Sequence, residues 1–194
     1  RAQQNLKKEL RAWENIVSLG HGDPQITRRI RELSLQKKVL AYEEHLKAAR
    51  QAYEAGNFVV ARKKIESAIK LRPKSKNALE LKSAIELAEK KHEAQHFVRA
   101  AAAEESKDNW EGAATAFAKA LKAMPTNSAA IQGRDRVTAL LQDRAKLQQL
   151  ARDSIRLSDP EVHAYAETVI AETDKWKALS PSFRKLRADV KIHL

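Results

Sequence analysis

The sequence contains no cysteine, and it has only 5 glycines and 5 prolines among 194 residues. Without cysteine, disulfides, cysteine-ligated zinc and thiol catalysis are excluded. So few glycines argue against the Gly-rich loops that cradle phosphates, and neither such a loop nor a nucleophile elbow can be read in the sequence. No pair of carboxylates marks a catalytic cleft either. We therefore expect no enzymatic activity and no cofactor.

Long apolar runs are also missing. The apolar runs that lack charged residues are only a few residues long, too short to span a bilayer. The chain begins at Arg1, which suggests a processed piece of a longer protein with a membrane anchor upstream. We expect a soluble module, either the extracytoplasmic part of a membrane-anchored bacterial protein or a cytoplasmic protein.

The residues that are abundant favour helices. Charged residues make up 32% of the chain and aromatics 5%, with Ala, Leu, Lys, Glu, Arg and Gln prominent, which is typical of an all-α protein. The formal net charge is +12. Such a balance attracts acidic proteins, nucleic acid or anionic lipid, and it does not choose among them.

Two stretches of the sequence, residues 56–73 and 108–125, carry the same pattern. Five positions match at a separation of 52 residues, pairing Phe58, Ala61, Ile65, Ala68 and Pro73 with Trp110, Ala113, Phe117, Ala120 and Pro125. The spacing of the first four predicts one stripe along a helix. The alanines allow a neighbouring helix to approach closely, and the proline ends the helix.

Long helices are predicted around these two short ones. Residues 24–56, 73–108 and 125–159 contain almost no glycine or internal proline. In the first of them an apolar seam steps by four and three residues through Leu35, Val39, Tyr42, Leu46, Ala49 and Tyr53. Short helices are expected at each end of the chain. The three tryptophans fall on apolar stripes and are expected in the core, at positions Trp13, Trp110 and Trp176.

The repeated pattern, with the turns Gly56-Asn57 and Asp108-Asn109 before it, resembles the second helix of a tetratricopeptide repeat. The resemblance is clearest over residues 42–75 and 94–127, where the first helices are longer than the family's. It implies an all-α, tetratricopeptide-like α-solenoid of alternating long and short antiparallel helices, forming a single domain over residues 1–181. Residues 182–194 would form a basic C-terminal segment that is incomplete or only partly ordered.

The same resemblance implies a function. Stacked helix pairs of this family leave a groove, so the chain would be a non-enzymatic scaffold that binds a peptide or helix of a partner protein, acidic partners included. The groove would be lined by the long helices. Its expected residues are Glu43, Leu46, Arg50, Tyr53, Gln95, Val98, Ala102 and Glu105.

A second hypothesis uses the densest basic run. It predicts a basic surface that binds nucleic acid or an anionic surface, formed by Arg62, Lys63, Lys70, Lys74 and Lys76. The alternative for these residues is a solvated convex face that keeps the protein soluble. No aromatic residue is interleaved for base stacking, which makes nucleic acid the weaker partner class.

A third hypothesis concerns the string His92-Glu93-Ala94-Gln95-His96, which matches the H-E-x-x-H pattern of zinc metallopeptidases. Both histidines would lie one turn apart on a long helix. They fall on the flank away from the apolar face around Val98, and no third ligand or strand accompanies them. We therefore favour a solvated charged face with no metal.

Overall fold

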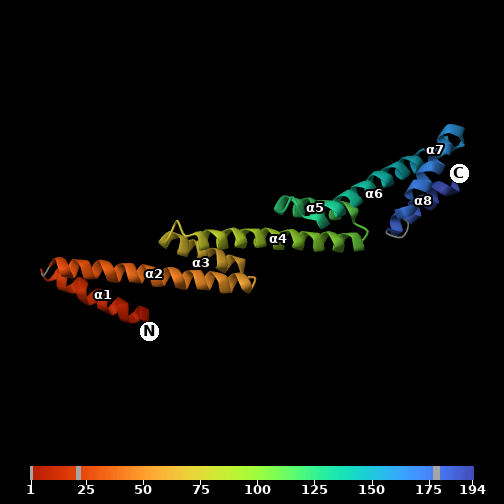
Figure 1. Cartoon of the computed structure of the whole chain (residues 1–194). Helices are drawn as coiled ribbons and strands as arrows, with labels where there is room; N and C mark the ends of the chain where they lie inside the picture. Colours follow the sequence, from red (N-terminus) through yellow and green to blue (C-terminus); the bar gives the residue numbers. More distant parts are fainter. Residues whose placement is uncertain (1, 21–22, 177–179) are drawn as a thin grey trace. The chain divides into compact units, whose positions relative to one another are not determined.

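The computed structural model describes residues 2–20, 23–176 and 180–194 of the chain. Within them the protein is all-α, which confirms the predicted class, and long helices alternate with short ones (Figure 1). The elements are α1 (Ala2–Ser18), α2 (Pro24–Glu54), α3 (Phe58–Leu71), α4 (Lys76–Ser106), α5 (Trp110–Ala123), α6 (Ser128–Arg152), η1 (Ser154–Ser158), α7 (Pro160–Glu172), η2 (Thr173–Trp176) and α8 (Pro181–Ile192).

The helices form two compact units, Arg1–Glu89 and Lys90–Leu194, and α4 contributes residues to both. None of the helices in the described ranges is both long and apolar enough to cross a membrane. The expected single domain over residues 1–181 stays a prediction.

In the first unit, α2 packs against α1 and α3. Asp23 begins α2 by accepting a hydrogen bond from the Gln25 N–H at 2.8 Å, and Pro24 occupies the first turn, where no N–H is needed. Arg29 of α2 pairs with Glu9 of α1 at 2.7 Å. The core of the unit consists of Tyr42, Ala49, Ala61, Ile65, Ala68, Ala78 and Ile85.

The apolar seam expected along α2 is correct only in its second half. Tyr42 and Ala49 are buried, but Leu35 is 56% exposed and Leu33 is fully buried instead. The two leucines lie about 200° apart around the helix axis. Because α2 packs against α1 as well as α3, its apolar face is not one uninterrupted seam.

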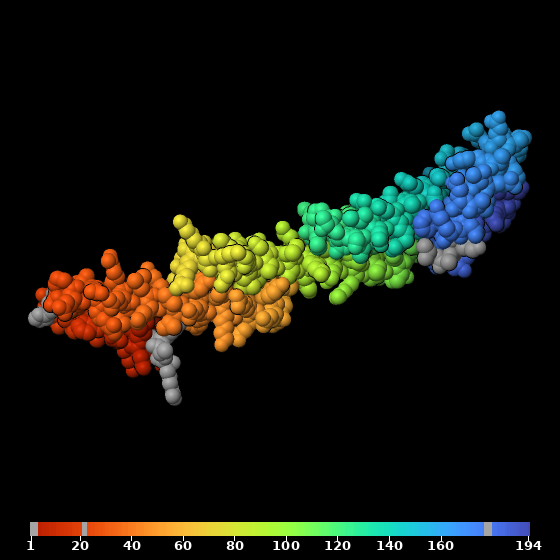
Figure 2. Space-filling view, viewed as in Figure 1, coloured from red at the N-terminus to blue at the C-terminus, as the bar shows by residue number. Residues whose placement is uncertain are grey.

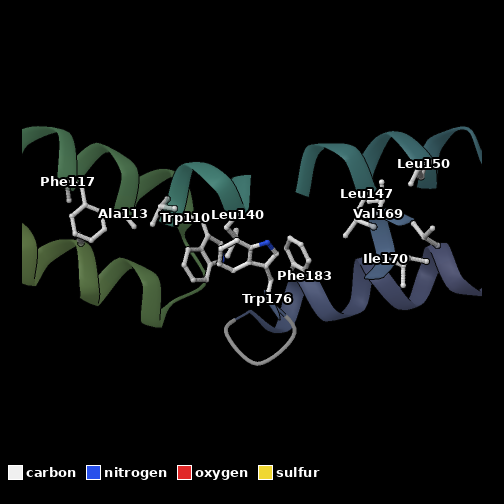
Figure 3. Packing of buried hydrophobic residues seen from close by; sticks show 14 of the residues in the cluster. Trp110, Ala113, Phe117, Leu140, Leu147, Leu150, Val169, Ile170, Trp176 and Phe183 are labelled. Carbon is white, nitrogen blue, oxygen red and sulfur yellow. The ribbon is translucent and has the colours of Figure 1, made fainter. Parts of the chain in front are cut away.

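In the second unit, α6 packs against α5, α7 and α8. The C-terminal helices, in blue, lie against the end of α6 in Figure 2. The core includes two of the three tryptophans, Trp110 and Trp176, as predicted, whereas Trp13 in the first unit is only half-buried. Figure 3 shows part of this cluster. Most of the segment 182–194, which was predicted to be incomplete or only partly ordered, lies in α8, and this helix buries Phe183 and Val190.

The 52-residue correspondence extends beyond the positions read from the sequence. The short helices α3 and α5 both contain 14 residues, and their starts, Phe58 and Trp110, are 52 residues apart. The ends of α2 and α4, and the starts of α4 and α6, show the same separation. Eight pairs of buried residues from α2–α4 and α4–α6 share it: Leu33 and Ile85, Tyr42 and Ala94, Ala49 and Ala101, Ala61 and Ala113, Ile65 and Phe117, Ala68 and Ala120, Ala78 and Ala130, and Ile85 and Val137. The predicted packing role of the small residues is confirmed.

Candidate protein-interaction surface

The eight expected groove residues form two equivalent faces, one in each unit. Glu43, Leu46, Arg50 and Tyr53 lie on α2, and their counterparts 52 residues later, Gln95, Val98, Ala102 and Glu105, lie on α4. The exposure matches pair by pair. In each set the first and third residues are exposed and the second and fourth are half-buried. Both faces therefore combine two half-buried positions with two solvent-facing ones.

On the α2 face, Leu46 and Tyr53 pack against the core of the first unit. The Tyr53 ring also contacts Phe58, with 6.4 Å between the ring centroids. Glu43 and Arg50 point to solvent. A partner would thus meet one carboxylate and one guanidinium above a fixed apolar base.

On the α4 face, Val98 packs against the core of the second unit. Glu105 forms an ion pair with Arg136 of α6 at 2.6 Å, so its charge is already engaged within the protein. Gln95 and Ala102 are exposed. This face is therefore less charged than its counterpart on α2.

The five residues of the predicted basic surface all lie in the first unit and are all exposed. Arg62, Lys63 and Lys70 come from α3, Lys74 from the following turn and Lys76 from the start of α4. Arg62 lies 3.7 Å from Glu89, and Lys76 lies 3.7 Å from Glu80. Solvent-exposed pairs of this kind are weak, so most of the positive charge stays available to a partner.

The histidine string lies on α4, and His92, Glu93 and His96 are all exposed. The His96 ring packs edge-on against Phe97, with 5.6 Å between the centroids. Nowhere in the described ranges do three or more His, Cys, Asp or Glu side chains gather in a way that could hold a metal ion. The zinc peptidase hypothesis thus gains no further ligand from the described residues.

Asp108 is a polar anchor that the sequence did not reveal. Its carboxylate accepts hydrogen bonds from the Trp110 Nε1–H and the Ser180 hydroxyl, each at 2.5 Å, and from the Ser182 N–H at 2.9 Å. Burial alone would raise the pKa of Asp108, but the hydrogen bonds from Ser180, Ser182 and Trp110 outweigh it and lower the pKa to about 2. The charged carboxylate therefore ties the turn before α5 to the start of α8.

Asp143 of α6 is a second anchor. It is buried and accepts the indole N–H of Trp176 at 2.7 Å, with Lys146 at 3.2 Å and Lys175 at 3.4 Å. Burial raises the pKa of Asp143, but the hydrogen bonds from Trp176 and Lys146 and the charge of Lys175 lower it overall. Each of the two buried tryptophans is thus held by an aspartate.

No family model matches the sequence, and no curated protein or solved structure matches it. Its function is therefore inferred from the residues and their arrangement.

Arg187 of α8 is a third polar anchor that was missed, and it is buried. It donates to the Ile170 carbonyl at 3.0 Å and to the Asp174 carboxylate at 2.8 Å. Its position offered a signal, because it lies on the same stripe as the buried residues Phe183 and Val190. Asp143 lies between Leu140 and Leu147 in the same manner. A charged residue at a core-facing position therefore marks both sites.

Proposed function

We propose that the chain is a non-enzymatic, tetratricopeptide-like helical-repeat module that binds a peptide or helix of a partner protein on the exposed faces of its long helices. The observation that carries the proposal is the 52-residue repeat of the α2–α3 and α4–α5 helix pairs, including the matched exposure of the face residues. Repeat proteins use such recurring faces as binding surfaces.

The chemistry of the α2 face supports a protein ligand. Glu43 and Arg50 are exposed and carry opposite charges, while Leu46 and Tyr53 supply a half-buried apolar base between and beside them. Fixed apolar contacts with a polar rim are typical of peptide-binding surfaces. A helix or extended peptide with complementary charges would bury the exposed parts of Leu46 and Tyr53.

The second candidate is a nucleic-acid or anionic-surface binding module. The five residues of the basic surface favour it, because all five are exposed and lie close together in the sequence, on α3, the following turn and the start of α4. Binding of this kind depends steeply on salt, with a loss of roughly 10³-fold or more between about 50 and 200 mM when many phosphates are contacted. Peptide binding on the α2 face would depend far less on salt.

Affinity capture from a native lysate distinguishes the two candidates. The purified chain serves as bait, with half of the lysate treated with nuclease. The test variant Glu43→Lys/Arg50→Glu exchanges two charges on the α2 face without altering the net charge. Its control, Lys7→Glu/Glu14→Lys, makes the same exchange at exposed positions of α1.

The proposal predicts that one discrete protein is captured with or without nuclease treatment. The α1 control should capture the same protein, whereas the α2 variant should capture little or none of it. Recovery that disappears with nuclease would favour the basic surface instead. Recovery of no protein would contradict the binding module.

A further inference from the structure

An open pocket of about 460 Å³ lies between α4 and α5 in the second unit. It is lined by Lys90, Glu93, Phe97, Lys119, Lys122 and Ala123. None of these residues belongs to the two groove faces or to the basic surface in the first unit. We call it the lysine pocket.

The helical spacing explains the lining. On α4 the three residues follow one another by three and four positions, and on α5 by three and one, so each set lies along one side of its helix. Phe97 is half-buried against the core of the second unit and forms an apolar base. The Lys119 ammonium lies over its ring, 5.9 Å from the centroid. The three lysines themselves are exposed.

The charge of the pocket is strongly one-sided. Three ammonium groups surround it, and Glu93 is the one carboxylate in its lining. Its volume falls within the range of about 300–1,000 Å³ that accommodates ligands. We propose that the lysine pocket binds an acidic segment of a partner protein, with Asp or Glu side chains on the lysines and one apolar side chain over Phe97. This inference rests on the proposed function and names the chemistry of the partner.

The details of the pocket favour an acidic peptide over nucleic acid. Its cations are lysines, which act as point charges and lack the bidentate geometry by which arginine recognises phosphate. Phe97 is half-buried and is the one aromatic residue in the lining, whereas single-stranded nucleic acid stacks successive bases on several aromatic side chains. One aliphatic side chain of an acidic peptide fits the single apolar contact at Phe97 better than a row of stacked bases does.

The corresponding positions of the first unit differ from the lysine pocket. Lys38 and Lys70 occupy the positions 52 residues before Lys90 and Lys122, on α2 and α3, and both are exposed. The counterpart of Phe97 is His45. The first unit therefore repeats two of the three lysines, has Ser67 in place of Lys119, and lacks the apolar base.

The test measures binding of a labelled Glu-Glu-Leu-Glu-Glu peptide by fluorescence anisotropy. The pocket variant is Lys119→Glu/Lys122→Glu, and the control with the same change in net charge is Lys37→Glu/Lys38→Glu, at exposed positions of α2. We expect the pocket variant to bind about tenfold more weakly and the control to differ from wild type by less than about twofold. Replacing the central leucine of the peptide by alanine should also weaken binding. Circular dichroism and the melting temperature show whether both variants fold. If the pocket variant does not fold, Lys119→Gln/Lys122→Gln replaces it.

Three results would overturn the pocket assignment. The first is that wild type does not bind the peptide at about 1 mM, which is the weak end of measurable affinity. The second is an equal loss of binding in the pocket variant and the control. The third is tighter binding of a single-stranded oligouridylate than of the peptide. The capture experiment keeps the two proposals separate. If a nuclease-resistant partner is captured equally by wild type and the pocket variant while the peptide does not bind, the pocket assignment is wrong and the proposed function stands. If no protein is captured, the proposed function is wrong.

Discussion

Gly56 and Asp108 lie 52 residues apart, and both have left-handed backbone conformations, with φ of 72° and 60°. Each is followed by an asparagine that caps the next short helix: Asn57 accepts from the Val60 N–H at 3.2 Å and Asn109 from the Gly112 N–H at 3.1 Å. Glycine adopts this conformation freely, whereas aspartate is strained in it. The contacts of the Asp108 carboxylate offset that strain, so the repeat preserves the turn while its chemistry differs.

Asp108 should make the protein sensitive to acid. Its pKa is about 2 in the folded protein, against 3.8 for an ordinary aspartate, so its charged form is favoured by folding. The sign follows from linkage: the stabilisation is complete above an ordinary aspartate pKa and is lost as the pH falls toward about 2. We expect Asp108→Asn to lower the free energy of unfolding by roughly 1–2 kcal/mol at neutral pH.

Urea unfolding of wild type and Asp108→Asn between about pH 2 and pH 7 measures this contribution. Asparagine also tolerates the left-handed conformation, so the backbone is conserved. The gap between the two proteins should shrink as the pH falls below 4. A gap that is constant across the series would show that the charge of Asp108 is not responsible.

Ala113→Leu tests the packing of the repeated short helices. Ala113 is fully buried on α5, and we expect the larger side chain to lower the free energy of unfolding by about 1–3 kcal/mol through overpacking. The control is Ala118→Leu on the exposed side of the same helix, which should change stability by less than about 0.5 kcal/mol. Thermal or urea unfolding compares them. Full stability of Ala113→Leu would mean that the packing of α5 is wrong.

Gly133→Ala on α6 separates helix propensity from packing. Propensity alone predicts that alanine stabilises a helix by up to about 1 kcal/mol over glycine. A Cβ at Gly133, however, would overlap the ring of Phe117, so we expect a loss of about 1–3 kcal/mol.

The same change in a Phe117→Leu background should cost less, because the smaller side chain leaves room for the methyl group. A double-mutant cycle of unfolding free energies measures the coupling. Stabilisation by Gly133→Ala in the wild-type background would refute the close contact between α5 and α6.

Asp143→Ala tests the second tryptophan anchor. The change removes the acceptor of the buried Trp176 N–H and the carboxylate that Lys146 and Lys175 share, and we expect it to lower the free energy of unfolding by about 1–3 kcal/mol. Trp176→Phe, which removes the N–H from the other side, should make Asp143→Ala less harmful. Strictly additive losses in the two variants would show that the hydrogen bond contributes little.

The helices and the small buried residues could be predicted because their signals are local and periodic. The spacing of Ala61, Ile65 and Ala68 alone predicts a buried stripe, and the prolines and asparagines nearby mark the helix ends. Leu35 could not be assigned in this way. Its exposure depends on which neighbours α2 packs against, and that information lies elsewhere in the chain.

The polar anchors and the lysine pocket could not be predicted from the sequence for a related reason. Asp108 meets Ser180 across 72 positions of sequence, and Lys119 meets Phe97 only because α4 and α5 pack together. Spacing within one helix gives no information on such pairs. Asp143 and Arg187 did leave a trace, as charged residues on apolar stripes, which identifies a buried polar group without naming its partner.

Site-specific photo-crosslinking tests the central claim most directly. A benzoylphenylalanine is placed at Arg50 on the α2 face and, as a control, at Glu14 on the exposed side of α1, and each protein is irradiated in nuclease-treated native lysate. A protein-binding module predicts an adduct with one discrete protein from position 50 and none with that protein from position 14. The absence of a protein adduct from position 50, or the same adducts from both positions, would contradict it.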